Sequence, residues 1–359
     1  MTIPKITGIT YKPLLCRELS SYDIKSLTDV FDKDASFILN FDKGVQIAVS
    51  WWVSAKRTRS YPYSRVYDTL GFQGKKVTII PIFKDEGKEG DRDFLQWDTI
   101  SLMSLLGVYT IISYYNRADK STRYDHKITN QRFDIKHLQS NFANLLSYQS
   151  DALHWNLSQI ENVGIVGEKA LAAYKNISQK LEIDMHSFTT AHSRIQELLK
   201  GKENFMNLSR NLAQKAQARE KTTIQPKEQL DGTKATLTIK NYLGGYYYFT
   251  CDEAKLIKNS ICLIEGKHSK GSMIPSTEDI KDGLIKMILF SNLKEVKIGD
   301  KEYTPLPILK LTSDIGFSIE NLSSSKIDLL QLLLKESLVN KFEVLINGKK
   351  LNDYQPFKN

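Results

Sequence analysis

Residues 246–272, YYYFTCDEAKLIKNSICLIEGKHSKGS, contain two apolar runs that flank a short charged turn. Their β-branched and aromatic residues predict two strands, and the polar turn between them predicts a hairpin. Asp252 ends the first apolar run, and Glu265, Gly266 and Lys267 end the second. Such residues at strand ends are typical either of a solvated hairpin with a cross-strand ion pair or of the edge of a metal site.

The segments around the hairpin predict a mixed arrangement of strands and helices. A helix is predicted over 276–293, because a Ser or Thr cap precedes Glu278 and Asp279 in its first turn. A second, amphipathic helix is predicted over 323–340. Further strands are predicted for short β-rich runs at 235–242, 294–299, 306–313 and 342–348.

The N-terminal part also predicts an α/β region. Its predicted strands are 36–41, 45–53, 75–83 and 108–115, and a helix over 94–107 is expected to end at Gly107. From about residue 135 to 218, apolar residues recur at intervals of three and four residues, which predicts a helical middle.

The predicted fold class is therefore α/β (α+β). Three parts are expected, because 359 residues are more than a single hydrophobic core usually supports. They are an α/β region over 1–130 with a possible role in DNA recognition, a helical middle with a basic linker over 131–230, and a domain over 231–359 that carries the hairpin.

Net charge and composition restrict the partners. The formal net charge is +9, which favours an anionic partner, and nucleic acid is the commonest of these; the alternative is a merely alkaline protein. We expect no membrane span, because the sequence lacks a run of 18 or more apolar residues. Three cysteines without metal-ligand spacing, and a start unlike a signal peptide, favour a cytoplasmic location.

The chemistry of the hairpin depends on strand alternation. Glu265 and Lys267 are two residues apart and share one face of their strand, while Asp252 lies on the neighbouring strand about 4.8 Å away. Two carboxylates suit Mg²⁺, which keeps several waters and takes further ligands from phosphate. A lysine beside them can position or deprotonate a nucleophile, and Gly266 permits close approach of a substrate.

The pattern Asp-x₁₂-Glu-x-Lys, formed by Asp252, Glu265 and Lys267 and followed by a helix, resembles the PD-(D/E)xK nuclease superfamily. The resemblance covers roughly residues 235–310, and TCD replaces the family's Pro-Asp. It implies a mixed-sheet nuclease core in the C-terminal third, Mg²⁺ held by Asp252 and Glu265, and a catalytic Lys267.

With no helicase, ATP or P-loop motif, the chain looks most like a type II restriction endonuclease of a restriction–modification system. This implies site-specific double-strand cuts in DNA without a nucleotide cofactor. One site per chain favours a homodimer on a palindromic target.

Several alternatives stay open. One alternative is a repair or recombination nuclease of the same fold, and another is a DNA-binding protein without catalysis. A rival metal site is the acidic loop that contains Lys84, Asp85, Glu86, Glu89, Asp91 and Asp93. Glu253 is a weaker candidate ligand, since it should face away from Asp252. Candidate DNA contacts are the basic residues Lys56, Arg57, Arg59 and Arg65, although a charge-rich loop between strands is the simpler interpretation.

Overall fold

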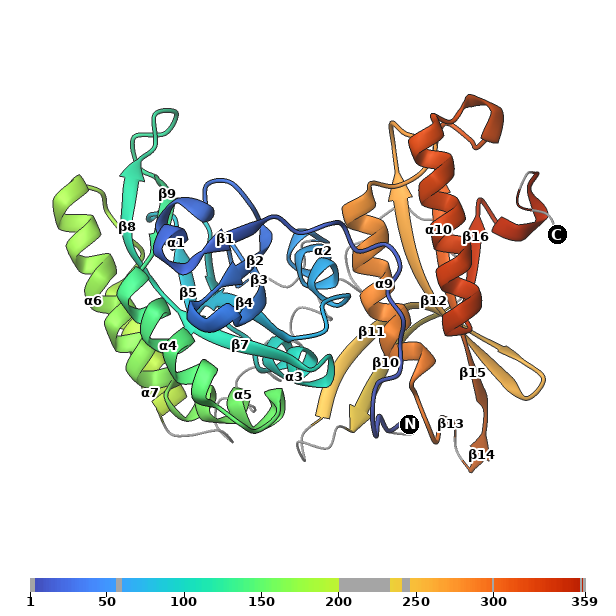
Figure 1. Ribbon diagram of the computed structural model, residues 1–359, viewed down its shortest axis with the longest axis horizontal. Helices are drawn as coiled ribbons and strands as arrows, with labels where there is room; N and C mark the ends of the chain where they lie inside the picture. Colours follow the sequence, from blue (N-terminus) through green and yellow to red (C-terminus); the bar gives the residue numbers. More distant parts are fainter. Residues whose placement is uncertain are drawn as a thin grey trace. The chain divides into compact units, whose positions relative to one another are not determined.

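Figure 1 shows the computed structural model, which describes residues 4–55, 60–199, 233–240, 246–298, 300–355 and 357. The chain divides into two compact units, and neither is continuous in sequence. Unit 1 contains Met1–Glu18, Tyr63–Gly71 and Ala213–Asn359, and unit 2 contains Leu19–Pro62 and Phe72–Leu212. Most of the predicted N-terminal region thus shares unit 2 with the helical middle, whereas its residues 1–18 and 63–71 belong to unit 1. The predicted boundary at residue 231 lies outside the described residues.

Unit 2 is built on a five-stranded sheet. Its strands, in spatial order, are β1 (Ser21–Asp23), β2 (Ser36–Asn40), β3 (Gln46–Trp51), β4 (Lys75–Pro81) and β7 (Val108–Ser113). β2 and β3, which lie within the predicted strands 36–41 and 45–53, form an antiparallel hairpin, and β3, β4 and β7 run parallel. Val77, Ile79 and Ile80 of β4 are all buried, as expected for a strand covered on both faces.

Helices and short hairpins complete unit 2. The helices are α1 (Leu27–Val30), α3 (Trp97–Leu105), α4 (Ile135–Ser147), α5 (Ala152–Glu161), α6 (Val163–Leu181) and α7 (Phe188–Leu199). As predicted, α3 stops before Gly107, whose φ of +69° suits glycine. Two hairpins, β5–β6 (Phe83–Asp85 with Arg92–Phe94) and β8–β9 (Tyr115–Lys120 with Ile128–Phe133), were not predicted.

Unit 1 contains a six-stranded mixed sheet. Its strands, in spatial order, are β10 (Thr233–Lys240), β11 (Tyr246–Ile257), β12 (Ser260–Ser269), β15 (Thr304–Ser313), β16 (Glu343–Ile346) and β17 (Lys349–Lys350). β10, β11 and β12 form an antiparallel meander, and β12, β15 and β16 run parallel. A small hairpin, β13–β14 (Lys297–Ile298 with Lys301–Glu302), precedes β15.

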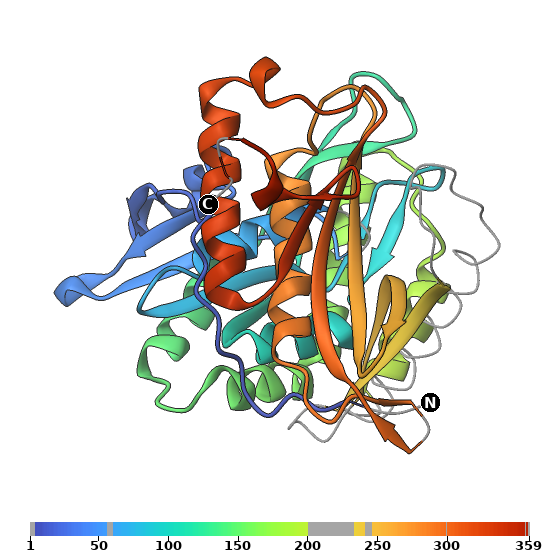
Figure 2. The same ribbon diagram turned by 90° about the vertical axis from the view of Figure 1, so that its right-hand side faces the viewer.

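The two helices of this sheet connect its parallel strands. α9 (Thr277–Ser291) connects β12 to β15, and α10 (Ser324–Asn340) connects β15 to β16. Both helices lie on the same face of the sheet (Figures 1 and 2), as two successive right-handed crossovers require. The predicted cap of α9 is confirmed, because the Ser276 hydroxyl accepts from the Asp279 amide. The mixed α/β class is confirmed, whereas the nuclease family of the core stays a prediction.

Unit 1 also includes segments from the start of the chain. Helix α2 (Ser60–Thr69) contributes Asp68, whose Oδ1 lies 2.5 Å from the Lys281 ammonium of α9. Glu336 of α10 is fully buried and accepts from four donors: the hydroxyls of Tyr11 and Tyr67 and the amides of Leu14 and Leu15. These contacts tie three distant segments into one folded unit. Within the described residues, no helix is long and apolar enough to cross a membrane.

Candidate active site on the β11–β12 hairpin

The hairpin brings Asp252 and Glu265 together as the sequence predicts. In the antiparallel β11–β12 pair, Glu253 lies opposite Ile264, so the next position along pairs Asp252 with Glu265 on one face of the sheet. The Gly266 amide donates to Asp252 Oδ2 over 2.9 Å. This bond fixes the aspartate beside the strand that carries the glutamate and the lysine.

Glu265 and Lys267 share the sheet face that α9 covers. Glu265 is 3% exposed, and its Oε1 lies 3.0 Å from the Lys267 ammonium. The three residues predicted from the sequence are therefore neighbours in the folded chain.

Helix α9 adds two residues that sequence reasoning missed. Lys286 donates to Glu265 Oε2 over 3.0 Å, and Lys267 also contacts Asp282 Oδ2. Asp282 and Lys286 are four residues apart and therefore lie on one side of the helix. That spacing, in the helix directly after the Glu-x-Lys strand, is the signal that would have identified them.

Gly283 allows this helix to approach the sheet closely. A Cβ atom at position 283 would lie 2.6 Å from Cδ1 of Leu309 and 3.4 Å from Cε of Lys267. Leu309 is fully buried, so it has little room to move aside. A side chain at position 283 would therefore push α9 away from Lys267.

Electrostatic coupling in this cluster is strong because the groups are buried. Burial alone would raise the pKa of Glu265, but the ammonium groups of Lys286 and Lys267 outweigh it and hold that pKa below its ordinary value. Burial would lower the pKa of Lys286, yet Glu265 and Asp252 raise it. For Asp282, burial prevails and the pKa is raised despite Lys267. Each charge in the cluster therefore depends on its neighbours.

The donor set can be tested against the implied Mg²⁺. Among the described residues, no three His, Cys, Asp or Glu side chains are grouped as a metal site. Mg²⁺ needs fewer protein ligands, because one or two carboxylates suffice when water and phosphate supply the remainder. Asp252 and Glu265 are hard oxygen donors on paired strands, so the type of donor fits. In this structure, however, both Glu265 oxygens contact lysines.

Two neighbouring titratable residues, Glu253 and His268, have partners outside this cluster. Glu253 is fully buried, and its ion-pair partners are Lys255, at 2.6 Å, and Lys310. Strand alternation places it on the opposite face from Asp252, as predicted. His268 contacts the Thr312 hydroxyl at 3.0 Å and Asp314 at 3.3 Å.

The acidic loop of unit 2 does not assemble a carboxylate cluster in the part of the chain that the structure describes. Three of its acids have three different partners. Asp85 lies 2.8 Å from His186 Nδ1, Asp93 accepts from the Ser54 hydroxyl, and Glu86 pairs with Lys84. The loop is thus held as the β5–β6 hairpin by separate contacts, which gives no support to the rival metal site.

The predicted DNA contacts are only partly described. Lys56, Arg57 and Arg59 lie outside the described residues. The segment from Ser60 onward is helix α2, in which Arg65 is half-buried, so the alternative of a charge-rich loop does not hold for this part of the stretch. Pro62 lies in the first turn of this helix, where a missing amide hydrogen is tolerated.

Neither a scan against protein-family models nor searches of curated proteins and of solved structures found a match to this chain.

Proposed function

We propose that this chain is a Mg²⁺-dependent endonuclease that hydrolyses phosphodiester bonds in double-stranded DNA, with the specificity of a type II restriction enzyme. One observation carries the proposal. The β11–β12 hairpin and α9 bring together Asp252, Glu265 and Lys267, and this cluster is the one by which the sequence resembles PD-(D/E)xK nucleases. The meander of β10, β11 and β12 followed by a helix supports the same assignment.

The residues have distinct roles in this proposal. Asp252 and Glu265 would hold Mg²⁺, which when bound polarises the scissile phosphate and lowers the pKa of water. Lys267 orients the attacking water and stabilises negative charge that develops on the phosphate. Asp282 positions the Lys267 ammonium from the other side. Lys286 keeps Glu265 ionised through the ion pair that lowers its pKa.

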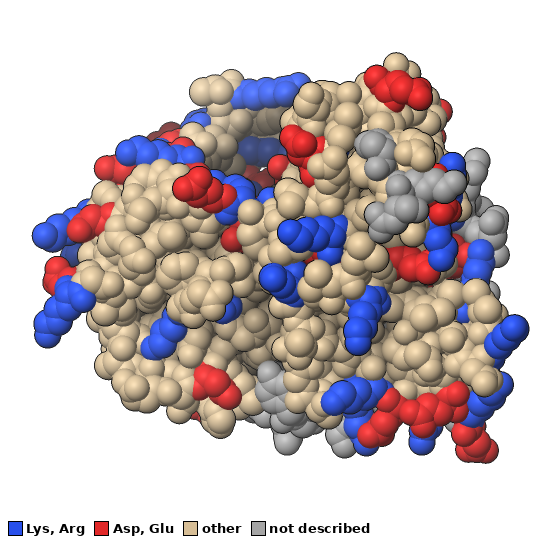
Figure 3. Space-filling view, turned by 45° about the vertical axis from the view of Figure 1, so that its right-hand side comes forward, with Lys and Arg blue, Asp and Glu red and all other residues tan. Residues whose placement is uncertain are grey.

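Surface charge is compatible with a nucleic-acid substrate but does not locate it. Among the described residues on the face drawn in Figure 3, basic and acidic side chains are interspersed. The net charge of +9 still favours an anionic partner through long-range attraction. One proposed site per chain favours a homodimer for cutting both strands.

The ion pairs that occupy both oxygens of Glu265 also favour a second candidate, a DNA-binding protein without catalysis. Both Glu265 oxygens contact ammonium groups at 3.0 Å, so this network is also suited to holding α9 on the sheet. A buried ion-pair network can be kept for packing specificity alone. The two candidates differ in one observable, which is whether DNA is cut.

A plasmid cleavage assay separates them. Supercoiled plasmid is incubated with the protein in Mg²⁺ and, in parallel, in EDTA. We expect discrete fragments only with Mg²⁺, and Glu265→Gln or Lys267→Ala should abolish them while DNA binding persists. Smeared or junction-specific products would instead indicate a repair or recombination nuclease of the same fold.

Glu278→Gln is the matched control, because Glu278 is an exposed carboxylate in the first turn of the same helix. It should cut like the wild type. Normal cleavage by Glu265→Gln and Lys267→Ala would refute the assignment, and retarded but uncut DNA in Mg²⁺ would establish the binding protein.

A further inference from the structure

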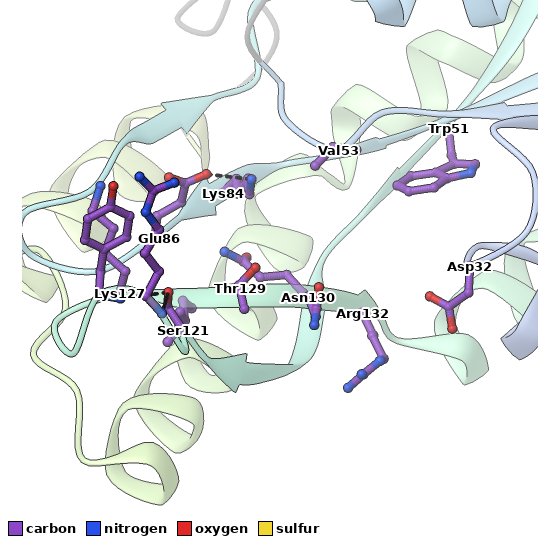
Figure 4. A pocket seen from close by; sticks show the side chains of 14 residues that line it. Asp32, Trp51, Val53, Lys84, Glu86, Ser121, Lys127, Thr129, Asn130 and Arg132 are labelled. Carbon is purple, nitrogen blue, oxygen red and sulfur yellow. Dashed lines mark hydrogen bonds and ion pairs between the residues drawn. The ribbon is translucent and has the colours of Figure 1, made fainter.

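Unit 2 contains a cavity of about 660 Å³ that lies apart in sequence from the candidate active site. Its wall combines basic and aromatic side chains, among them Trp51, Lys84, Arg123, Tyr124, Lys127 and Arg132. Figure 4 shows Thr129, Asn130 and Arg132 on the β9 side of the cavity, with Lys84, Val53 and Trp51 on the other. The β8–β9 hairpin therefore forms one wall of the cavity.

This hairpin is strongly basic. Residues 115–133 contain five Lys and Arg and two Asp, a net charge of +3 before the histidine at 126 is counted. Arg117, Lys120, Arg123 and Arg132 are exposed, and so is Tyr124, at 44%. The positive charge is thus on the surface, where an anionic partner can reach it.

Contacts within the hairpin hold several of these cations in place. The Arg123 guanidinium and the Lys127 ammonium each lie 5.3 Å from the centre of the Tyr124 ring. Arg132 makes a two-point ion pair with Asp119 across the strands, at 3.1 and 2.8 Å. Less side-chain entropy is then lost when a partner binds.

The shape of the hairpin also matches a nucleic acid. A two-stranded antiparallel ribbon fits the major groove of B-DNA, where its basic residues can reach phosphates on either side. A small anionic ligand in the cavity would account for the basic side chains that line it, such as Arg123 and Lys127, but not for basic side chains of the ribbon outside it. Here Arg117 and Lys120 of the same ribbon are exposed and are not among the residues that line the cavity. The distribution of charge therefore favours an extended polyanion.

We propose that the β8–β9 hairpin, with the basic wall of its cavity, binds the sugar–phosphate backbone of duplex DNA. The choice of DNA as the polyanion rests on the function proposed above. Arg123 and Lys127 are assigned to phosphates, and Tyr124 keeps their side chains at the tip of the ribbon.

The test is the salt dependence of DNA binding, measured in EDTA so that cleavage plays no part. A fluorescently labelled duplex is titrated with protein at several NaCl concentrations, and binding is followed by anisotropy. Removing both cations in Arg123→Ala/Lys127→Ala should flatten the slope of log K against log salt by up to about 1.8, since each phosphate contact contributes about 0.9. Affinity at 0.1 M salt should fall at least about tenfold on every duplex sequence.

Lys136→Ala/Lys180→Ala is the matched control, because it removes the same charge from exposed positions on α4 and α6 of the same unit. It should change the slope by much less than the hairpin variant. Circular dichroism should show that both double variants are folded, because none of the four substituted side chains is buried.

An unchanged slope and affinity in the hairpin variant would overturn the inference, as would equal losses in both double variants. Failure of the wild type to bind DNA at all would also overturn it and would point to an acidic protein as partner. Failure of the nuclease assignment looks different: Glu265→Gln would still cut, while the hairpin variant would still bind weakly.

Discussion

At the scale of single residues, Gly283 sets how closely α9 approaches Lys267. We expect Gly283→Ala to lower the free energy of unfolding by about 1–2 kcal/mol. Alanine gains up to about 1 kcal/mol of helix propensity, but the clash of its Cβ with buried Leu309 costs about 1–3 kcal/mol. Chemical denaturation measures the net change. A stabilised variant would mean that the sheet yields to the extra methyl group.

Lys286 provides a second test at this scale, which applies if cleavage is found. Lys286 helps to hold the pKa of Glu265 below its ordinary value, against burial, which raises it. Lys286→Met should therefore raise the pKa of Glu265, and the acid limb of the cleavage–pH profile should move to higher pH. Lys286→Arg keeps the positive charge and should leave the limb nearly in place. Equal profiles for both variants would exclude this role.

Single residues were placed correctly where the two-residue repeat of a strand alone decides on which face of the sheet a side chain lies. Alternation was enough to place Glu265 and Lys267 on one face and Glu253 on the other. It could not supply Asp282 and Lys286, because the rotation of α9 over the sheet depends on packing at residues such as Gly283. The four-residue spacing of Asp282 and Lys286 marks them as a pair on one side of the helix, but packing decides that this side faces the sheet.

At the scale of elements, the cap of α4 predicts an acid sensitivity. Asp134 accepts from the His137 amide at 2.8 Å and from the Asn116 side chain at 2.7 Å. Burial would raise its pKa, but these bonds and the one from Tyr114 lower it. A carboxylate whose folded pKa is depressed stabilises the protein above its unfolded pKa, about 3.9, and loses that contribution as pH falls through the folded pKa.

Asp134→Asn should consequently cost about 1 kcal/mol at pH 7, a modest figure because solvent partly screens this cap. The difference from the wild type should be smaller at pH 3 than at pH 7, and it should approach zero only below the depressed folded pKa, where the Asp134 side chain is neutral as well. Melting temperatures of both proteins at the two pH values test this. A difference that is the same at pH 7 and pH 3 would show that the charge of Asp134 is irrelevant.

Elements with strong apolar periodicity were predicted well, and those with polar surfaces were not. The strands β3 and β4 and the helices α9 and α10 follow their patterns closely. The β8–β9 hairpin was missed because its alternating positions are largely charged and polar, so period-two hydrophobicity is weak. Helix α2 was also missed, because its arginines and tyrosines weaken the apolar pattern. Segments distant in sequence pack against its buried face.

At the scale of the whole molecule, unit 1 depends on residues 1–18, which are far from its sheet in sequence. Leu14 and Leu15 donate their amides to buried Glu336, and Tyr11 donates its hydroxyl. Ile6 and Leu15 are themselves buried. Losing two buried aliphatic side chains costs about 3–6 kcal/mol, and the lost hydrogen bonds to a charged group add about 1.5–3 kcal/mol each. The total approaches the stability of an average domain, about 5–15 kcal/mol.

Deleting residues 1–18 should therefore loosen unit 1 and spare unit 2. Hydrogen exchange resolves the two by segment: the amides of α9, α10 and β12 should lose protection, while those of β4 and β7 keep it. Glu336→Gln in the full chain is the milder comparison, because its amide oxygen can still accept from Leu14 and Leu15 while its nitrogen donates to the tyrosine hydroxyls. It should retain most of the protection in α10. Undiminished exchange protection of α9 and α10 in the deleted chain would mean that the sheet and its two helices are stable without the N-terminal segment.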